Sequence, residues 1–236
     1  MSLHRGPELP YIVVAGVTPW GRRWLVGSAK LHTVNFAPEA PQVFSSFLEV
    51  LSQYPAYSAI VVNAPIGYVK DFESAPRLCD VEARALLGRR AAALSYAPPR
   101  SVMNDTGAGP YPHLGAVGAM MLPRYREVAS EMSPFRQRTV YQGHPELSFF
   151  QLNEDTPLRW SKQREEGREE RRALLERRIP GIGAIIDSQI PHVPQKHLLD
   201  VAALAWTARR VMSRGARRVP ADAQWDDEGL RMEYVY

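Results

Sequence analysis

Polar residues close three apolar stretches of the chain, and their positions predict a shared site. Thr18, Asn63 and Gln142 each stand at the end of a β-branched run that indicates a buried strand. In open α/β sheets, ligands bind outside the carboxyl ends of the strands. We therefore expect these three side chains to line one cleft, with Asp200 nearby.

Three residues near these strand ends carry acid–base or metal-binding chemistry. His144 and Glu146 flank Pro145 at the end of the third stretch. Two interpretations stay open for this pair: a turn whose polar groups satisfy the backbone, or a site for acid–base chemistry or metal binding. Asp200 lies on an otherwise apolar helix face, and a buried carboxylate requires a partner, which favours a role in a site.

A fourth acid, Asp80, lies between Arg77 and Arg84 over about two helical turns. One interpretation is a surface ion-pair cluster that adds little stability. The other is a pocket wall that binds an anion, because guanidinium groups match the geometry of phosphate oxygens. Arg100 follows two prolines and is either a loop arginine aimed at the cleft or an exposed one.

The chain lacks the motifs of several common enzyme classes. It has no glycine-rich Walker or dinucleotide loop, no Gly-x-Ser-x-Gly elbow and no His-Glu-x-x-His pair. Its single cysteine, Cys79, excludes an intramolecular disulfide and a zinc site built of cysteines. The six histidines are scattered, so a histidine metal cage is not indicated.

The order of the predicted elements indicates a mixed α/β sheet. Residues 11–18, 23–30 and 31–36 predict a meander of three strands, residues 41–54 a helix, and residues 58–63 a further strand that returns parallel to the first. Helical spacing of apolar residues and dense charge predict helices further on. The other expected elements are helices over 77–90, 116–132, 161–178 and 197–213, a long loop over 95–115, a strand over 139–143 and an edge strand over 230–235.

Length and composition suit one globular domain. The chain has 236 residues, of which 45% are hydrophobic and 23% charged. We expect an N-terminal tail over residues 1–10 and a single domain with additional helices over residues 11–236. The longest apolar runs are far shorter than a bilayer span, so we expect no membrane association and a cytoplasmic location. The oligomeric state is not indicated by the sequence.

Taken in order, a set of short motifs resembles one family. The chain is similar in these motifs to the domain of unknown function 429 family, the predicted ribonuclease-H-like nucleases. The motifs are Val14-Ala-Gly-Val-Thr18 with Trp24, Val62-Asn-Ala-Pro-Ile-Gly67, Arg77-Leu-Cys-Asp80, Arg84-Ala-Leu-Leu-Gly88, Ala97-Pro-Pro-Arg100, His144-Pro-Glu146 with Ser148-Phe149, Lys162 with Gly167-Arg168, Leu199-Asp200, and Gly229-Leu-Arg-Met-Glu233.

The resemblance implies a ribonuclease-H-like fold, which is a mixed five-stranded sheet flanked by helices. Such folds usually hold Mg²⁺ or Mn²⁺ on carboxylates at the strand ends, where the ions stabilise the attacking and leaving oxygens of a phosphodiester. This sequence departs from the family pattern at three such positions. Thr18 and Asn63 stand where the family usually has aspartates, and Gln142 stands where it usually has a glutamate.

These departures favour one of two functional hypotheses. The first is a catalytically degenerate protein that binds a phosphate-bearing ligand, a nucleotide or a nucleic acid in the cleft without any certain cofactor. The alternative is an active metal-dependent phosphodiester hydrolase, which would use Mg²⁺ or Mn²⁺. The first hypothesis assigns ligand binding to Thr18, Asn63, Arg77, Arg84, Arg100 and Gln142, and the alternative assigns catalysis to Asp80, His144, Glu146 and Asp200.

Two expectations follow for the cleft. Without three acids, it should bind divalent metals weakly or not at all, because amide oxygens supply a dipole but no charge. If Arg77, Arg84 and Arg100 face inward, they should dominate its potential, and a phosphate-bearing ligand should bind near Arg77 and Arg100 without metal.

Overall fold

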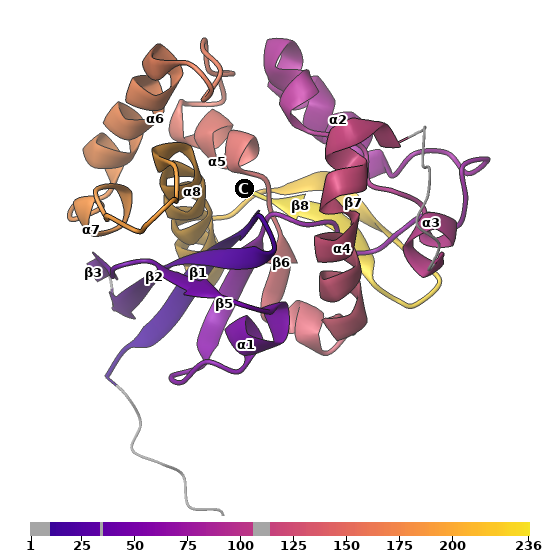
Figure 1. Cartoon of the computed structure of the whole chain (residues 1–236), viewed down its shortest axis with the longest axis horizontal. Helices are drawn as coiled ribbons and strands as arrows, with labels where there is room; N and C mark the ends of the chain where they lie inside the picture. The colour runs from indigo at the N-terminus through magenta and orange to yellow at the C-terminus, as the bar shows by residue number, and fades with distance from the viewer. Residues whose placement is uncertain (1–9, 34, 106–113) are drawn as a thin grey trace, which may run out of the picture.

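A mixed β-sheet forms the centre of the protein, which the computed structural model describes over residues 10–33, 35–105 and 114–236. The strands follow the order β3-β2-β1-β5-β6, and β4 also pairs with β2 (Figure 1). This arrangement confirms the predicted α/β class with a ribonuclease-H-like sheet. The strands are β1 (Ile12–Trp20), β2 (Arg23–His32), β3 (Asn35–Pro38), β4 (Gln42–Phe44), β5 (Tyr57–Val62) and β6 (Val140–Gln142).

The direction of the central strands determines where their polar ends lie. β1 pairs with β2 antiparallel and with β5 parallel, and β5 pairs with β6 parallel. In the parallel register Val17 lies beside Val62, and Val62 lies beside Gln142. The carboxyl ends of β1, β5 and β6 therefore meet at one edge of the sheet, as the strand-end residues predicted.

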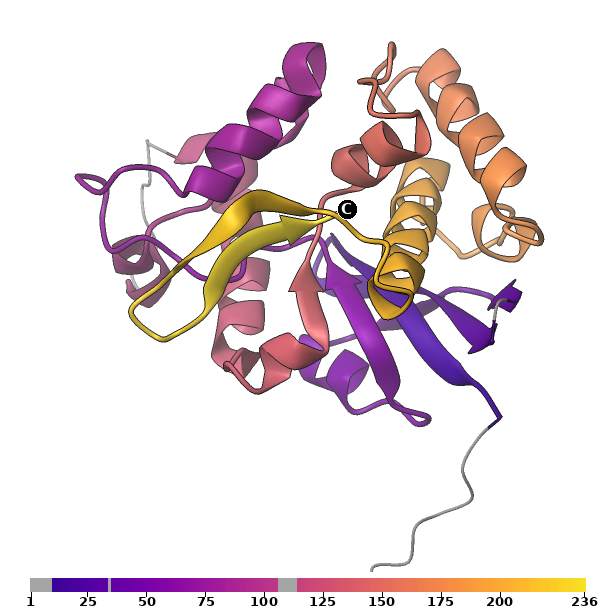
Figure 2. The same ribbon diagram turned by 180° about the vertical axis from the view of Figure 1, so that it is seen from behind.

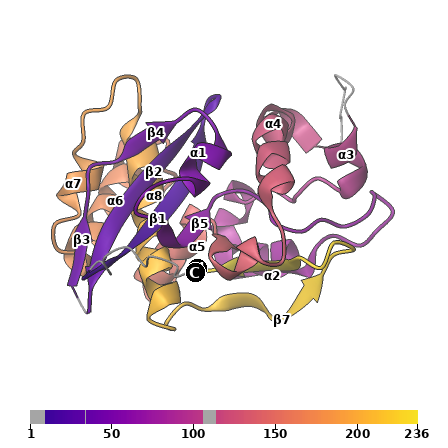
Figure 3. The ribbon, with the colours of Figure 1, turned by 90° about the horizontal axis from the view of Figure 1, so that it is seen from below.

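Helices cover both faces of the sheet because side chains alternate along each strand. Val14, Ala59 and Val61 pack in one apolar cluster with α8 (Gln195–Met212). Val17, Ile60 and Val62 pack in a second cluster with α1 (Phe47–Leu51) and α4 (Gly115–Glu131), on the other face (Figure 3).

Helix α8 lies unusually close to β1, and Gly16 is the reason. A Cβ atom at Gly16 would lie 2.3 Å from both the Ala205 nitrogen and the Val201 oxygen, so only glycine allows this contact. The close packing brings the first half of α8, which carries Asp200, against the carboxyl end of β1.

Further helices flank this core, and a hairpin crosses the back of the molecule. The hairpin consists of β7 (Arg218–Trp225) and β8 (Arg231–Val235), which pair antiparallel and lie beside the helix α2 (Leu78–Leu87) (Figure 2). The remaining helices are α3 (Arg100–Asn104), α5 (Pro145–Leu152), α6 (Glu165–Arg178) and α7 (Gly183–Ile186), with short 3₁₀ turns at Gly88–Ala93 and Arg136–Arg138.

Two predictions of local structure were wrong. The helix expected over 41–54 is instead the strand β4 followed by the five-residue helix α1, whose first turn is capped by the Ser46 side chain. Pairing of β4 with β2 overrides the local helical spacing there. The expected loop over 95–115 contains α3, and residues 106–113 of it lie outside the described residues.

Candidate functional site

A pocket of about 310 Å³ lies at the carboxyl ends of β1, β5 and β6. Thr18, Asn63, Gln142 and Asp200 all line it, which confirms the predicted convergence. We call it the strand-end pocket. Its other polar lining residues include His144, Lys162, Gln163, His197 and Tyr96.

Backbone hydrogen bonds place the residues at the ends of β1, β5 and β6 beside one another. The Asn63 amide nitrogen donates to the Val17 oxygen at 2.8 Å, and the Gly143 nitrogen donates to the Val62 oxygen at 3.0 Å. The Asn63 Nδ2 atom donates to the Thr18 Oγ1 atom at 3.2 Å. Two of the three strand-end groups therefore contact each other directly.

Two hydrogen bonds to its side-chain oxygen hold Gln142 in one orientation. Its Oε1 atom accepts hydrogen bonds from the Ile66 nitrogen at 2.8 Å and from Arg77 Nη1 at 3.1 Å. A flipped amide would set its NH₂ group against both donors, so the oxygen must face them. The Nε2 atom is left buried without a partner among the described residues.

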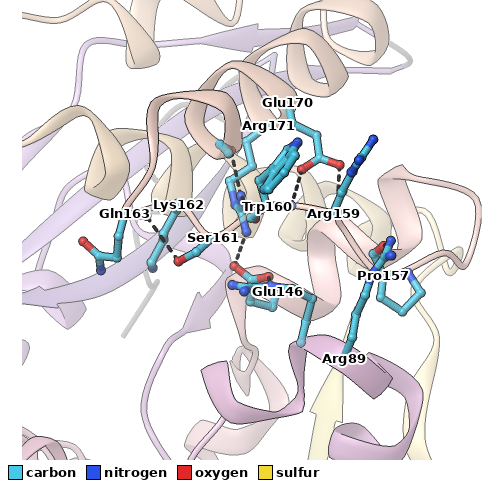
Figure 4. A network of polar contacts seen from close by, with 12 residues as sticks. Arg89, Glu146, Pro157, Arg159, Trp160, Ser161, Lys162, Gln163, Glu170 and Arg171 are labelled. Carbon is cyan, nitrogen blue, oxygen red and sulfur yellow. Dashed lines mark hydrogen bonds and ion pairs between the residues drawn. The ribbon is translucent and has the colours of Figure 1, made fainter.

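Asp200 is the carboxylate of the pocket, and Lys162 neutralises it. The Lys162 Nζ atom lies 2.5 Å from Asp200 Oδ2, while Asp200 Oδ1 is buried without a partner in the described part of the chain. Lys162 lies in a turn before α6, beside Ser161 and Gln163 (Figure 4). Gly167 permits this turn, because a Cβ there would lie 2.0 Å from the Ser161 oxygen.

His144 serves as the N-cap of α5. Its Nδ1 atom accepts a hydrogen bond from the Glu146 nitrogen at 3.2 Å, which fixes its proton on Nε2. Burial lowers the pKa of His144 to about 4, although Glu146 opposes the shift. Burial also lowers the pKa of His197. Both rings are therefore neutral at physiological pH, and Lys162 supplies the positive charge of the pocket lining.

Glu146, an expected catalytic acid, does not line the pocket. It is buried in the first turn of α5, where Arg171 Nη2 lies 2.5 Å from its Oε1 atom (Figure 4). On the other side, Arg90 Nε lies 3.3 Å from Oε2. Burial alone would raise the pKa of Glu146, but Arg171 and Arg90 hold it below its usual range. The structure thus places Glu146 in an ion pair between α5 and α6.

Asp80 and Arg77 form a second buried pair behind the pocket. Arg77 Nη2 lies 2.6 Å from Asp80 Oδ1, and Arg77 Nε donates to Asp80 Oδ2 at 3.0 Å. The Tyr234 hydroxyl donates to Asp80 at 2.9 Å, and the Ala97 nitrogen donates at 3.0 Å. Burial opposes ionisation, but Arg77 holds the pKa of Asp80 below its usual value. Both residues are 1% exposed, so the pair is neither a surface cluster nor a wall of the strand-end pocket.

The other two expected arginines also lie outside the lining of the strand-end pocket. Arg84 Nη1 donates to the backbone oxygens of Ala91 and Leu94, and its guanidinium lies 4.8 Å from the centre of the Tyr96 ring. Arg100 pairs with Asp226 at 2.6 Å and with Glu228 at 2.9 Å, in the turn between β7 and β8. The condition on which Arg77, Arg84 and Arg100 were expected to dominate the potential of the cleft is therefore not met, because none of the three lines the strand-end pocket.

The donor set of the pocket does not fit Mg²⁺ or Mn²⁺. These ions bind through carboxylate charge, and the described residues of the pocket lining offer one carboxylate, which Lys162 already neutralises. Across the described ranges, no group of three or more His, Cys, Asp or Glu side chains is arranged to hold a metal ion.

Sequence reasoning missed two of the groups that characterise this pocket. Lys162 belongs to the motif Lys162 with Gly167-Arg168, but no role was predicted for it. The available signal was the glycine five residues after Lys162. Gly167 is required because α6 lies very close to the turn that carries Lys162. Tyr96 lies in the expected loop and also lines the pocket, but no role was predicted for it.

A comparison with protein-family models identifies the relationship of the chain. The model described as "Protein of unknown function (DUF429)" matches residues 16–224. The chain belongs to this family. The matched DUF429 region includes every strand-end residue of the pocket together with Lys162 and Asp200. The comparison with curated proteins and the comparison with solved structures each gave no match.

No helix within the described residues is long and apolar enough to cross a membrane. The cytoplasmic location, the domain boundary at residue 10 and the roles of the predicted site residues stay predictions.

Proposed function

We propose that this DUF429 protein binds a phosphate-bearing ligand, either a nucleotide or one unit of a nucleic acid, in the strand-end pocket. We propose further that it does so without metal and has lost the hydrolysis implied by its resemblance to predicted nucleases. The observation that carries the proposal is the pairing of Asp200 with Lys162, beside the neutral side chains of Thr18, Asn63 and Gln142.

Two groups support an anionic ligand in place of the arginines expected from the sequence. Lys162 is 24% exposed and has three N–H donors, of which one contacts Asp200. Gln142 also lines the pocket, and its Nε2 atom is a buried donor without a partner among the described residues. Donors of this kind suit phosphate oxygens, and partial burial strengthens such hydrogen bonds.

A metal-dependent phosphodiester hydrolase is the second candidate. It is favoured by one observation: Asp200 Oδ1 is a buried carboxylate oxygen with no partner among the described residues. Of the four acid–base residues predicted for this activity, His144 and Asp200 line the pocket, whereas Asp80 and Glu146 are held in ion pairs outside its lining.

The two candidates separate in a calorimetric titration with Mn²⁺ and a screen for phosphodiester hydrolysis. We expect the wild-type protein to show no Mn²⁺ binding and no hydrolysis, and the triple variant Thr18→Asp, Asn63→Asp, Gln142→Glu to gain Mn²⁺ affinity. The variant Ser52→Asp, Gln189→Glu adds exposed acids elsewhere and should gain none. Tight Mn²⁺ binding with hydrolysis by the wild type would overturn the proposal, and an unchanged affinity of the triple variant would refute the carboxylate argument.

A further inference from the structure

Two residues that line the strand-end pocket each carry a buried polar atom without a partner among the described residues, and the two atoms have opposite hydrogen-bonding character. Gln142 Nε2 is a donor and Asp200 Oδ1 is an acceptor. Gln142 is 3% exposed and Asp200 is 1% exposed, so both residues are almost fully withdrawn from solvent. A buried polar group without a partner costs about 1–3 kcal/mol, which a bound ligand with matching groups would recover.

The orientation of both atoms is fixed by their neighbours. Arg77 and Ile66 occupy the Oε1 side of Gln142, which directs the NH₂ group away from them. Lys162 occupies Oδ2 of Asp200, which leaves Oδ1 as the free oxygen. A complementary ligand must therefore present an acceptor to Gln142 and Lys162, and a donor to Asp200.

Phosphate alone supplies the required acceptor but not the required donor. Its oxygens accept hydrogen bonds from Gln142 and Lys162, but an anion places like charge beside the carboxylate of Asp200. A hydroxyl next to the phosphate supplies this donor to Asp200 Oδ1. In a ribonucleotide the 2′-hydroxyl stands beside the 3′-phosphate, and a deoxyribonucleotide lacks that donor.

An aromatic wall lies beside these polar groups. Tyr96 is 49% exposed, and it lines both the strand-end pocket and a neighbouring pocket of about 410 Å³ that Arg84 and Phe72 also line. The Arg84 guanidinium packs over the Tyr96 ring at 4.8 Å, which holds the ring in place. A held, half-exposed ring at the edge of a polar pocket offers a surface on which a nucleobase can stack.

We propose that the strand-end pocket selects a ribonucleotide unit over its deoxyribonucleotide counterpart. The phosphate accepts hydrogen bonds from Gln142 Nε2 and Lys162 Nζ, the 2′-hydroxyl donates to Asp200 Oδ1, and the base stacks on Tyr96. This inference rests on the proposed function, since it names the ligand class of the same pocket.

The test compares matched ligands by calorimetry with a metal chelator present. The probes are a ribonucleoside 3′-monophosphate, the 2′-deoxyribonucleoside 3′-monophosphate of the same base, and inorganic phosphate. We expect the ribonucleotide to bind about 10- to 100-fold more tightly than the deoxyribonucleotide, because the deoxy analogue leaves Asp200 Oδ1 unpaired. Inorganic phosphate should bind most weakly.

Variants locate the binding in the pocket. Gln142→Glu exchanges the donor for an acidic oxygen while keeping a partner for Arg77, so we expect it to fold and to lose ribonucleotide affinity. Gln189→Glu makes the same change at an exposed position and should leave the affinity unchanged. Tyr96→Ala should lower the affinity for both nucleotides about tenfold, because it removes the stacking ring. Tyr96→Phe keeps the ring and should bind both nucleotides as the wild type does.

The outcomes distinguish this inference from the proposed function. Equal affinity for the ribonucleotide and the deoxyribonucleotide would overturn the inference and leave phosphate-ligand binding intact. Ribonucleotide binding that Gln142→Glu does not change would also overturn it, because the ligand would then lie elsewhere. Absence of binding by all three probes would overturn both.

Discussion

The strand-end pocket and the Arg77 network behind it use similar polar side chains in opposite ways. Around Arg77 the guanidinium donates to Asp80, to the backbone oxygens of Ile66 and Gly67, and to Gln142 Oε1. In the pocket, Gln142 Nε2 and Asp200 Oδ1 have no partner among the described residues. Gln142 thus accepts hydrogen bonds through Oε1 from the Arg77 network, whereas its Nε2 atom has no partner among the described residues.

Under the proposed function, one motif set contains both structural and ligand-binding residues. Arg77 and Asp80 belong to the motifs that carry the family resemblance, but their charges are used within the protein. A buried pair of this kind is costly to break, whereas a buried atom without a partner favours a ligand. The predictions below test that division, from the largest expected effect to the smallest.

Removal of one partner from the Arg77 network should cause the largest loss of stability. Asp80→Ala leaves the Arg77 charge buried and unpaired, and we expect the free energy of unfolding to fall by about 3–5 kcal/mol. Chemical denaturation measures this loss. Glu228→Ala removes an exposed partner of Arg100 and should cost less than about 1 kcal/mol. A stable Asp80→Ala variant that loses ligand binding would instead make Asp80 a site residue.

Loss of the pocket lysine should weaken ligand binding. Lys162→Met removes the cation beside Asp200, and we expect nucleotide affinity in chelator to fall about 10- to 100-fold, as for other charged hydrogen bonds of about 1.5–3 kcal/mol. Lys196→Met changes a nearby exposed lysine that contacts Gln163 and serves as the control. Equal affinities of the two variants would exclude Lys162 from the site.

Acid should destabilise the folded protein through His144. The pKa of His144 is about 4 in the folded state, below its ordinary value of about 6.5, so the unfolded state takes up the proton first. The contribution of His144 to the free energy of unfolding is therefore fully present above about pH 6.5 and is lost as the pH decreases toward 4. We expect a loss of about 1–2 kcal/mol, because the ring is not fully buried.

A histidine-free cap provides the comparison for this pH effect. His144→Asn keeps a good N-cap for α5 without a titrating ring, so it should remove that part of the pH dependence. Denaturation curves between pH 7 and pH 4 measure both proteins. An identical pH dependence in the two would show that His144 is not the titrating group.

The smallest effect should come from an exposed ion pair. Arg172 and Glu176 lie 2.9 Å apart on the surface of α6, one helical turn from each other. Glu176→Ala should lower the free energy of unfolding by about 0.5 kcal/mol or less, since exposed pairs of this spacing contribute little. A loss as large as that of Asp80→Ala would contradict the distinction between buried and exposed charges.

The sequence predicted the strands of the core and the convergence of their polar ends because both follow from short-range patterns. A β-branched run indicates a buried strand, and parallel strands bring their carboxyl ends together. Thr18, Asn63 and Gln142 could therefore be placed in one pocket without any contact information. By contrast, β7 is largely polar, and its pairing with β8 is what defines it as a strand.

The roles of the arginines could not be predicted because they depend on long-range contacts. Arg77 precedes α2 in the chain and turns toward Gln142, which is 65 residues away. Arg100 reaches Asp226 across a separation of 126 residues. Helical spacing places Arg77, Asp80 and Arg84 near one another, but it does not say which of them face a pocket.

Binding of a ribonucleoside 3′-monophosphate, measured by calorimetry in excess chelator and again with Mn²⁺, tests most directly the claim that the strand-end pocket is a metal-free ligand site. We expect the same affinity under both conditions and no hydrolysis of a phosphodiester substrate when Mn²⁺ is present. Binding that requires Mn²⁺ and is accompanied by hydrolysis would contradict the claim.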